Sequence, residues 1–151
     1  MTEADKTRPA GAPTREAMLA VARVFYAAFA SGDVASLDAA FASDWRDNTL
    51  PPGRPPGLAG MKGAITALRA GVPDLACKVE DFVVEGDRVV ARITFSGQNR
   101  GGFLGKPPNG APIRFIAFDI HRIEGGRIVE SWHLEDNLTV LTQLGILPPL
   151  G

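Results

Sequence analysis

Two runs of alternating side chains near the C-terminus constrain the fold of this chain most. Residues 113–124 and 127–136 flank a Gly125-Gly126 pair, and apolar side chains recur along both runs with a period of two. This period is typical of β-strands, and two glycines can form the tight turn that joins antiparallel neighbours. The stretch therefore predicts a β-hairpin.

The predicted hairpin carries polar side chains that a strand filling a core would avoid. Both histidines of the chain, His121 and His133, lie on it, together with Asp119 and Asp136. An unpaired polar group costs about 2–7 kcal/mol to bury. These groups must therefore face water or line a cavity in which they have a chemical role.

The turn decides which side chains share a face of the hairpin. A two-residue loop would put Asp119 and His133 on opposite faces, whereas a three-residue loop over 124–126 puts Asp119 opposite Ser131 and on the face of His133. We expect the three-residue loop because it segregates the apolar side chains. The other face then carries Ile116, Phe118, Ile120, Trp132 and Leu134.

Helical patterns fill the first half of the chain. Thr14 can cap a helix over residues 15–31 that Gly32 ends, and Asp33 can cap a short second helix. The further elements expected in this half are a brief strand over 43–48, a proline-rich loop over 49–60 and a third helix over about 61–70.

Strand patterns fill the second half. A first hairpin is expected over 77–97, a Gly/Pro loop over 98–112 separates it from the second, and residues 138–145 can form a terminal turn of helix. Helices followed by antiparallel strands predict an α+β fold in which the helices pack on one face of a curved antiparallel sheet. We expect a disordered extension over 1–13 and a single domain over 14–151.

The composition excludes several classes of function. A formal net charge of -1 gives no reason to expect nucleic acid or an anionic membrane as partner. Because no apolar run could span a membrane and the first residues lack a secretory signal, we expect a cytoplasmic protein. The single cysteine, Cys77, is expected to be a small buried residue. Two histidines and one cysteine give no spacing for three convergent ligands, so we expect no metal.

Seven segments lie along the chain in a characteristic order: "SGDVASLDAAFASDW", "GLAGMKG", "VPDL", "EGDRVVARITFSG", "GGFLGKPPNG", "FDIHRIEGGRIVESW" and "LTQLG". Their order and spacing resemble the SnoaL-like polyketide cyclases, also called ester cyclases, over nearly everything after residue 15. The resemblance implies the cone-shaped, barrel-like fold shared with ketosteroid isomerase and nuclear transport factor 2. In that fold a bent sheet and helices enclose a deep apolar pocket. The resemblance also implies ring closure by intramolecular aldol condensation, with acid/base side chains and neither metal nor cofactor.

The resemblance also suggests which residues form the site. His133 stands where the family has its catalytic aspartate, and Asp119 where it has a pocket histidine, so the pair is exchanged. We expect His133 to be the base and Asp119 to orient it, since an imidazole with a pKa of roughly 6.5 suits proton transfer at neutral pH. Asn99 replaces a second family histidine, and Asn48 lies in a "DN" pair of the family's pattern. Either asparagine, or a water, could stabilise a developing enolate.

Other side chains have weaker assignments. Arg92 could bind an acidic substrate or neutralise Asp119. The alternative to a catalytic Asp119 is a structural one, in which it forms an ion pair with Arg92 or Arg114. His121 is expected at the rim or in solvent, and Glu135 and Asp136 are expected to cap the terminal helical turn or face solvent. The aromatic side chains expected to contact substrate are Trp45, Tyr26, Phe29, Phe103 and Phe115.

We therefore expect a cofactor-independent cyclase of a polyketide-like, carbonyl-bearing small molecule. The alternatives are an isomerase or hydrolase of the same fold, or a non-catalytic module that binds a small molecule, since fold alone does not fix function. An Asp119–Arg92 ion pair would favour the binding module. The apolar face of the hairpin predicts a homodimer or homotetramer.

Overall fold

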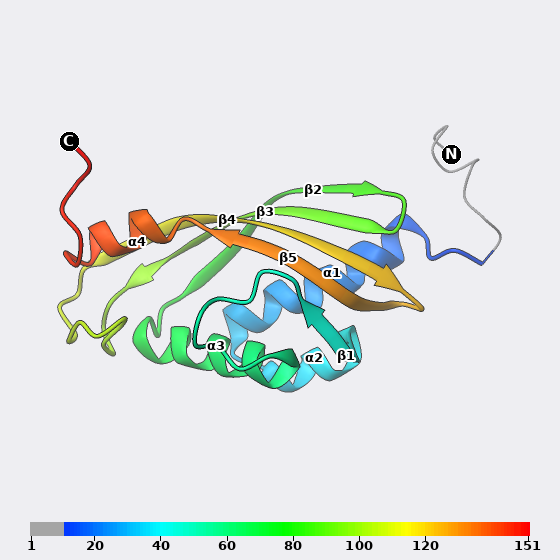
Figure 1. Cartoon of the computed structure of the whole chain (residues 1–151), viewed down its shortest axis with the longest axis horizontal. Coiled ribbons are helices and arrows are strands. Elements are labelled where there is room, and N and C mark those ends of the chain that lie inside the picture. The colour runs from blue at the N-terminus through cyan, green and yellow to red at the C-terminus, as the bar shows by residue number, and fades with distance from the viewer. Residues whose placement is uncertain (1–10) are drawn as a thin grey trace.

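A computed structural model describes residues 11–151 of the chain, and residues 1–10 of the predicted disordered extension lie outside this part. Its elements in order are α1 (Arg15–Ser31), a 3₁₀ turn (Val34–Ser36), α2 (Leu37–Ala40), β1 (Phe41–Asp47), α3 (Gly57–Gly71), β2 (Ala76–Glu85), β3 (Arg88–Gln98), β4 (Pro112–Glu124), β5 (Arg127–Glu135) and α4 (Asn137–Gln143) (Figure 1).

The first helix has the predicted bounds because both of its ends are capped. The Thr14 hydroxyl accepts a hydrogen bond from the Ala17 backbone N–H at 3.1 Å, and Gly32, at φ 79°, ends the helix. By contrast, α3 begins at Gly57 and not near residue 61, because the proline-rich loop already ends at Pro56. The loop predicted over 49–60 therefore ends earlier, because residues 57–60 already belong to α3.

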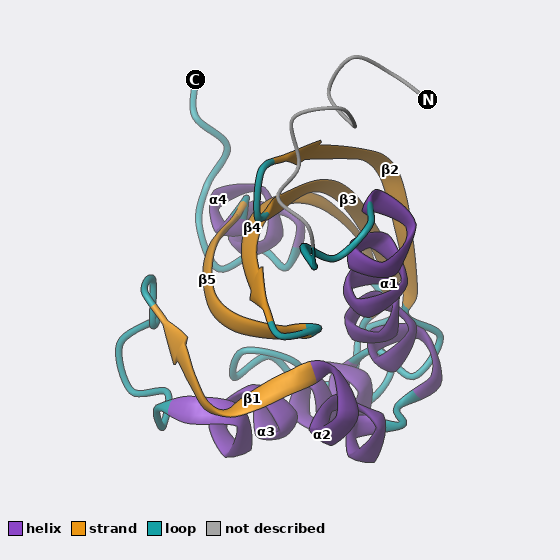
Figure 2. Cartoon of the chain, turned by 90° about the vertical axis from the view of Figure 1, so that its right-hand side faces the viewer, coloured by secondary structure: helices purple, strands orange, loops and turns teal. Residues whose placement is uncertain are grey.

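The five strands form one curved sheet in the order β1-β5-β4-β3-β2. Strands β2 to β5 pair antiparallel, as predicted, whereas β1 pairs parallel with β5. The sheet curls into an arc that does not close into a barrel, and the helices α1, α2 and α3 lie across its open side (Figure 2). The concave face of the sheet and these helices therefore enclose the core.

The turn between β4 and β5 differs from the predicted one. Its two glycines, at φ 59° and 75°, form a two-residue loop, so the expected three-residue loop is wrong. A β-bulge follows, in which Val129 is the extra residue on β5. This bulge restores the alternation, so that Asp119 lies directly opposite His133 on the same face of the sheet.

Apolar side chains pack between the concave face and the helices. Cys77, which was expected to be buried, is half-buried and packs against this core. On the convex face, by contrast, Ile116, Phe118 and Leu134 stay exposed, and Leu134 shows 75% of its surface. None of the helices within residues 11–151 is long and apolar enough to span a membrane.

We predict that the convex face of the sheet joins two copies of the chain. Its exposed apolar side chains form a patch of the kind that usually marks an interface. Light scattering at micromolar concentration should give at least twice the monomer mass, and Leu134→Lys should lower this mass. Leu138→Lys, on α4, changes an equally apolar exposed residue outside the sheet and should leave the mass unchanged. A monomeric wild-type protein would contradict the prediction.

Candidate active site

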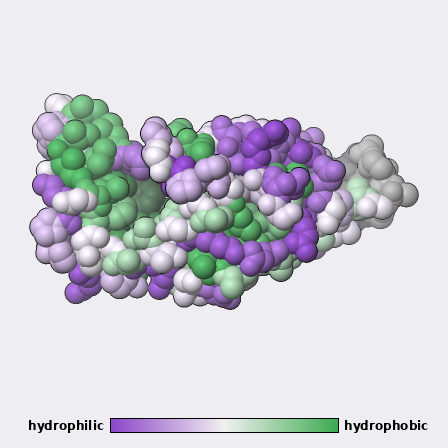
Figure 3. Space-filling model, turned by 60° about the horizontal axis from the view of Figure 1, so that its bottom comes forward, coloured by the Kyte–Doolittle hydropathy of each residue, from purple (hydrophilic) through white to green (hydrophobic). Residues whose placement is uncertain are grey.

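A cavity of about 530 Å³ lies between the concave face of the sheet and α3, which is a volume suited to a small organic ligand. Figure 3 shows a hollow with apolar side chains around it in the left half of the view. The apolar lining includes Phe25, Phe29, Trp45, Met61, Leu68, Phe95, Phe103, Phe115, Val140 and Leu141. The polar side chains in the wall are Arg54, Asp119, His121, Ser131, His133, Glu135 and Asn137.

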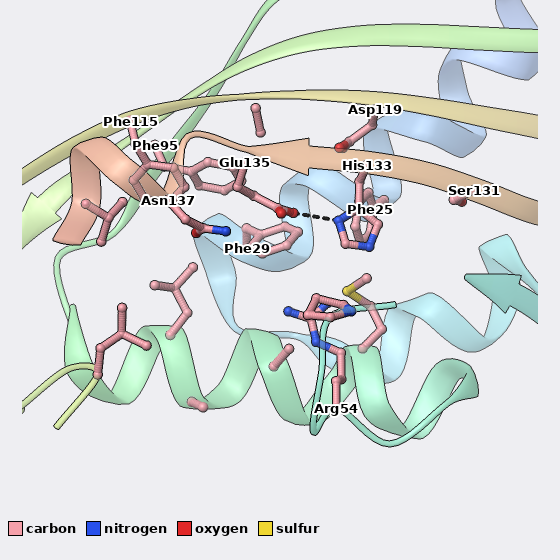
Figure 4. A pocket seen from close by; sticks show the side chains of 18 of the residues that line it. Phe25, Phe29, Arg54, Phe95, Phe115, Asp119, Ser131, His133, Glu135 and Asn137 are labelled. Carbon is pink, nitrogen blue, oxygen red and sulfur yellow. Dashed lines mark hydrogen bonds and ion pairs between the residues drawn. The ribbon is translucent and has the colours of Figure 1, made fainter. Parts of the chain in front are cut away.

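Six of the predicted site residues lie in this wall. They are Trp45, Phe29, Phe103, Phe115, Asp119 and His133. Tyr26 lies behind the wall, where its hydroxyl contacts Asp119. The structure therefore brings together the two strands and the aromatic side chains that the sequence pointed to, and Figure 4 shows several of them around one space.

The two asparagines are not part of the lining. Asn48, just after β1, donates its side-chain N–H to Glu130 Oε2 at 3.1 Å. Asn99 is fully buried and holds the loop after β3 together, because its amide donates to the Pro107 carbonyl at 3.0 Å and to Asn109 Oδ1 at 3.1 Å. Their predicted places in the cavity are therefore wrong, and both asparagines have structural partners instead.

Arg92 also lies outside the cavity. It pairs with Phe118 across β3 and β4 and so lies on the convex face, where its Nε donates to Asp81 Oδ2 at 2.8 Å. Within residues 11–151, no ion pair joins Asp119 to Arg92 or to Arg114. The alternation of side chains explains this correction: Arg92 and Asp119 belong to opposite faces of the sheet.

His133 lies between two carboxylates that the sequence analysis did not assign to the site. Its Nδ1 is 2.7 Å from Glu135 Oε1, and its Nε2 is 2.9 Å from Asp47 Oδ2. Burial lowers the pKa of His133, but the hydrogen bonds and negative charges of Glu135 and Asp47 outweigh burial and raise this pKa to about 9. The ring is therefore an imidazolium at neutral pH, and it donates both of its N–H groups to these carboxylates.

Glu135 does not face solvent or cap the last helix, as had been expected. Its side chain points into the cavity from β5, toward the ring of His133, and Arg54 approaches the same space from the loop before α3 (Figure 4). Burial raises the pKa of Glu135, yet the hydrogen bond from His133 and the positive charges hold it below its usual value. The cap of α4 comes from Asp136 alone, which accepts the Thr139 N–H at 3.1 Å, as predicted.

Asp119 has a different environment although it faces His133. Its Oδ2 accepts a hydrogen bond from the Tyr26 hydroxyl at 2.8 Å, and its Oδ1 has no hydrogen-bond partner within residues 11–151. Burial raises the pKa of Asp119 to about 7, although the Tyr26 hydrogen bond and the charge of His133 oppose this rise. Asp119 can therefore take up and release a proton near neutral pH.

His121 is buried in the wall and not at the rim, so its predicted position is wrong. Its Nε2 is 2.9 Å from the Tyr26 hydroxyl, and its Nδ1 is 2.7 Å from Ser131 Oγ. Ser131 Oγ in turn accepts the indole N–H of Trp45 at 3.0 Å. Burial lowers the pKa of His121 to about 3, so the ring is neutral.

The described residues, 11–151, contain no group of three His, Cys, Asp or Glu side chains arranged to hold a metal ion. Independence of metals and cofactors remains a prediction.

Comparison with known proteins places the chain beside one family. Residues 20–144 match the family model of the SnoaL-like polyketide cyclases. A candidate polyketide cyclase from Bacillus cereus has a similar structure, with 39% identity, a TM-score of 0.78 and coverage of 87% of this chain and 82% of that one. TsrD from Streptomyces laurentii is 35% identical, with a TM-score of 0.82 and coverage of 90% and 100%. IdmH from Streptomyces antibioticus, a candidate polyketide cyclase, is 33% identical, with a TM-score of 0.74 and coverage of 85% and 98%. The comparison with curated proteins gave no match.

Proposed function

Because the chain belongs to the SnoaL-like polyketide cyclase family, we propose that it closes a ring in an apolar small molecule with two carbonyl groups, without a cofactor. The family and the names of similar structures support a cyclase-type role. One observation carries the finer proposal. Asp119, whose Oδ1 has no hydrogen-bond partner within residues 11–151 and whose pKa is about 7, lies in a mainly apolar cavity beside the imidazolium of His133.

The reaction needs one group that both accepts and returns a proton. The carboxylate of Asp119 removes a proton from the carbon next to one carbonyl, which gives an enolate. The enolate carbon then attacks the second carbonyl carbon, so that a C–C bond forms and the C=O π bond breaks. The new alkoxide takes the proton back from Asp119. The product is an isomer of the substrate, and no oxidant or co-reactant is consumed.

We further propose that His133 supplies fixed positive charge and is not the base. Both of its ring nitrogens already donate hydrogen bonds, to Glu135 and Asp47, so neither has a lone pair for a substrate proton. A positive ring opposite Asp119 stabilises its carboxylate and the oxyanion that develops beside it. This assignment reverses the roles that the sequence suggested for the pair.

The experiment measures proton abstraction directly. A phenyl-substituted acyclic diketone that can close a six-membered ring is incubated with the protein in D₂O, and NMR follows both deuterium uptake next to the carbonyls and ring formation. We expect both processes, and we expect them to persist in the presence of a chelator. Deuterium uptake without ring closure would favour an isomerase. Binding of the diketone with neither process would favour the non-catalytic module.

A further inference from the structure

In the cavity wall and directly behind it, five side chains from four elements form one continuous hydrogen-bond chain. It runs from Trp45 on β1 through Ser131 on β5 and His121 on β4 to Tyr26 on α1, and it ends at Asp119 on β4. Its links are 3.0, 2.7, 2.9 and 2.8 Å long. All five residues are at most 5% exposed, so bulk solvent has little access to them.

One end of the chain fixes the direction of its hydrogen bonds. An indole N–H can only donate, so Trp45 must donate to Ser131 Oγ. The Ser131 hydroxyl then has its own proton left, and its only other hydrogen-bond partner within residues 11–151 is Nδ1 of His121. The neutral His121 ring accepts this proton at Nδ1 and therefore carries its own proton on Nε2.

The other end agrees with this direction only if Oδ2 of Asp119 carries no proton, as in the carboxylate or in an acid protonated at Oδ1. With a proton on Nε2, His121 donates to the Tyr26 oxygen, and the single hydroxyl proton of Tyr26 points to Asp119 Oδ2. An Asp119 that was protonated at Oδ2 and donated to Tyr26 would reverse every link except the one from Trp45. Ser131 would then accept from both Trp45 and His121, and its own buried proton would have no described partner.

We propose that Tyr26 and His121 are positioning residues: the chain they form requires Oδ2 of Asp119 to accept, and it leaves Oδ1 as the oxygen that takes up and releases a proton in the cavity. This inference rests on the proposed function for its catalytic meaning, but not for its geometry. The chain stabilises the charged carboxylate against the cost of burial and passes no proton to the substrate itself.

Several titratable groups lie near Asp119. Tyr26 on α1 and His133 on β5 favour its charged form, whereas Glu135 on β5 and Asp47 on β1 oppose it. Cys77 on β2 and His121 on β4 are also near. Burial has the largest effect and raises the pKa of Asp119, and the hydrogen bond from Tyr26 is the largest effect in the opposite direction. Loss of the Tyr26 hydroxyl should therefore raise this pKa further.

The first test reads the direction of the chain in the wild-type protein. The sequence has only two histidines, so ¹⁵N NMR of the imidazoles resolves both. We expect a neutral His121 with its proton on Nε2 throughout the neutral range, and a His133 with both nitrogens protonated as an internal contrast. A His121 protonated on Nδ1, or charged at neutral pH, would overturn the proposal.

The second test removes one oxygen atom. In Tyr26→Phe, ¹³C NMR of the Asp119 carboxyl should show a pKa higher by about one to two pH units, because a hydrogen bond to a charged group contributes about 1.5–3 kcal/mol. The acidic limb of the kcat/KM profile should move upward by the same amount. Ser131→Ala, which breaks the chain further from Asp119, should give a smaller shift in the same direction. Thr66→Val, which removes an exposed hydroxyl on α3, should leave the profile unchanged.

The two readouts separate the inference from the proposed function. An unchanged Asp119 pKa in folded Tyr26→Phe and Ser131→Ala proteins would overturn the positioning role, even if the wild type closes the ring. A shifted pKa in a protein that turns over no diketone would support the hydrogen-bond chain and refute the cyclase.

Discussion

Asp119→Asn is expected to lower the rate of ring closure by about 10²- to 10⁴-fold, which is the usual contribution of a positioned base. The asparagine amide has the shape of the carboxyl group and can still accept the hydrogen bond from Tyr26, which is 2.8 Å long in the wild type. It cannot accept a substrate proton. Affinity for the diketone should change little, since only the transition state loses a contact. Single-turnover rates on variants whose fold is checked by thermal melting measure the effect.

A matched control separates the loss of a base from the loss of a carboxylate in general. Asp81→Asn makes the same chemical change on the convex face, where Asp81 pairs with Arg92. It should leave the rate near that of the wild type. A folded Asp119→Asn protein that closes the ring at the wild-type rate would end the assignment of Asp119 as base, and deuterium uptake in that variant would show whether another group has the role.

Features that depend on a few neighbouring residues could be predicted from the sequence. Thr14 and Gly32 set the ends of α1 because a cap depends on one side chain and one backbone angle. The Gly-Gly turn likewise identified the hairpin. Glu135 could also have been found, because it lies two residues after His133 on one strand and must share its face.

Features that depend on distant pairing could not be read in the same way. Asp47 reaches His133 because β1 joins the sheet parallel to β5, and these residues are 86 positions apart. Tyr26 and Asp119 are 93 positions apart. No local sequence pattern predicts the bulge at Val129, although this one extra residue places Asp119 and His133 on the same face.

The misplaced residues have a common physical explanation. Asn99 is predicted in the cavity because it replaces a histidine of the resembling family, and Arg92 because it could bind an acidic substrate or neutralise Asp119. The structure gives each of them a nearer partner, in the loop after β3 for Asn99 and on the convex face for Arg92. A polar side chain therefore indicates a site only when its face of the sheet is known.

The second large effect concerns stability and arises from His133. Its pKa is about 9 in the folded protein and 6.5 as the reference value, so its charged form favours the folded state. This contribution is complete below pH 6.5 and is lost as the pH rises through about 9. A difference of this size corresponds to about 3 kcal/mol in the free energy of unfolding. Urea unfolding at fixed protein concentration, at several pH values across this range, should show the decline.

Other groups titrate mainly outside this range. The pKa of Asp119 is raised from 3.8 to about 7, so its contribution to stability is lost mainly as the pH rises from 3.8 to about 7. Glu135 has a lowered pKa, so its contribution is lost only as the pH falls through acidic values. The pKa of Cys77 is raised to about 12. The decline from pH 6.5 to 9 therefore reports mainly on His133.

His133→Gln should remove this decline and lower stability at neutral pH by roughly 3–5 kcal/mol, because Asp47 and Glu135 then stay buried without their cation. Glu135→Gln keeps the ring but removes one of its two anions, so the decline should become smaller and move to lower pH. A wild-type stability that is flat from pH 6.5 to 9 would mean that the His133 ring is neutral. One ring nitrogen would then have a lone pair for a substrate proton, and His133 would again be the better candidate for the base.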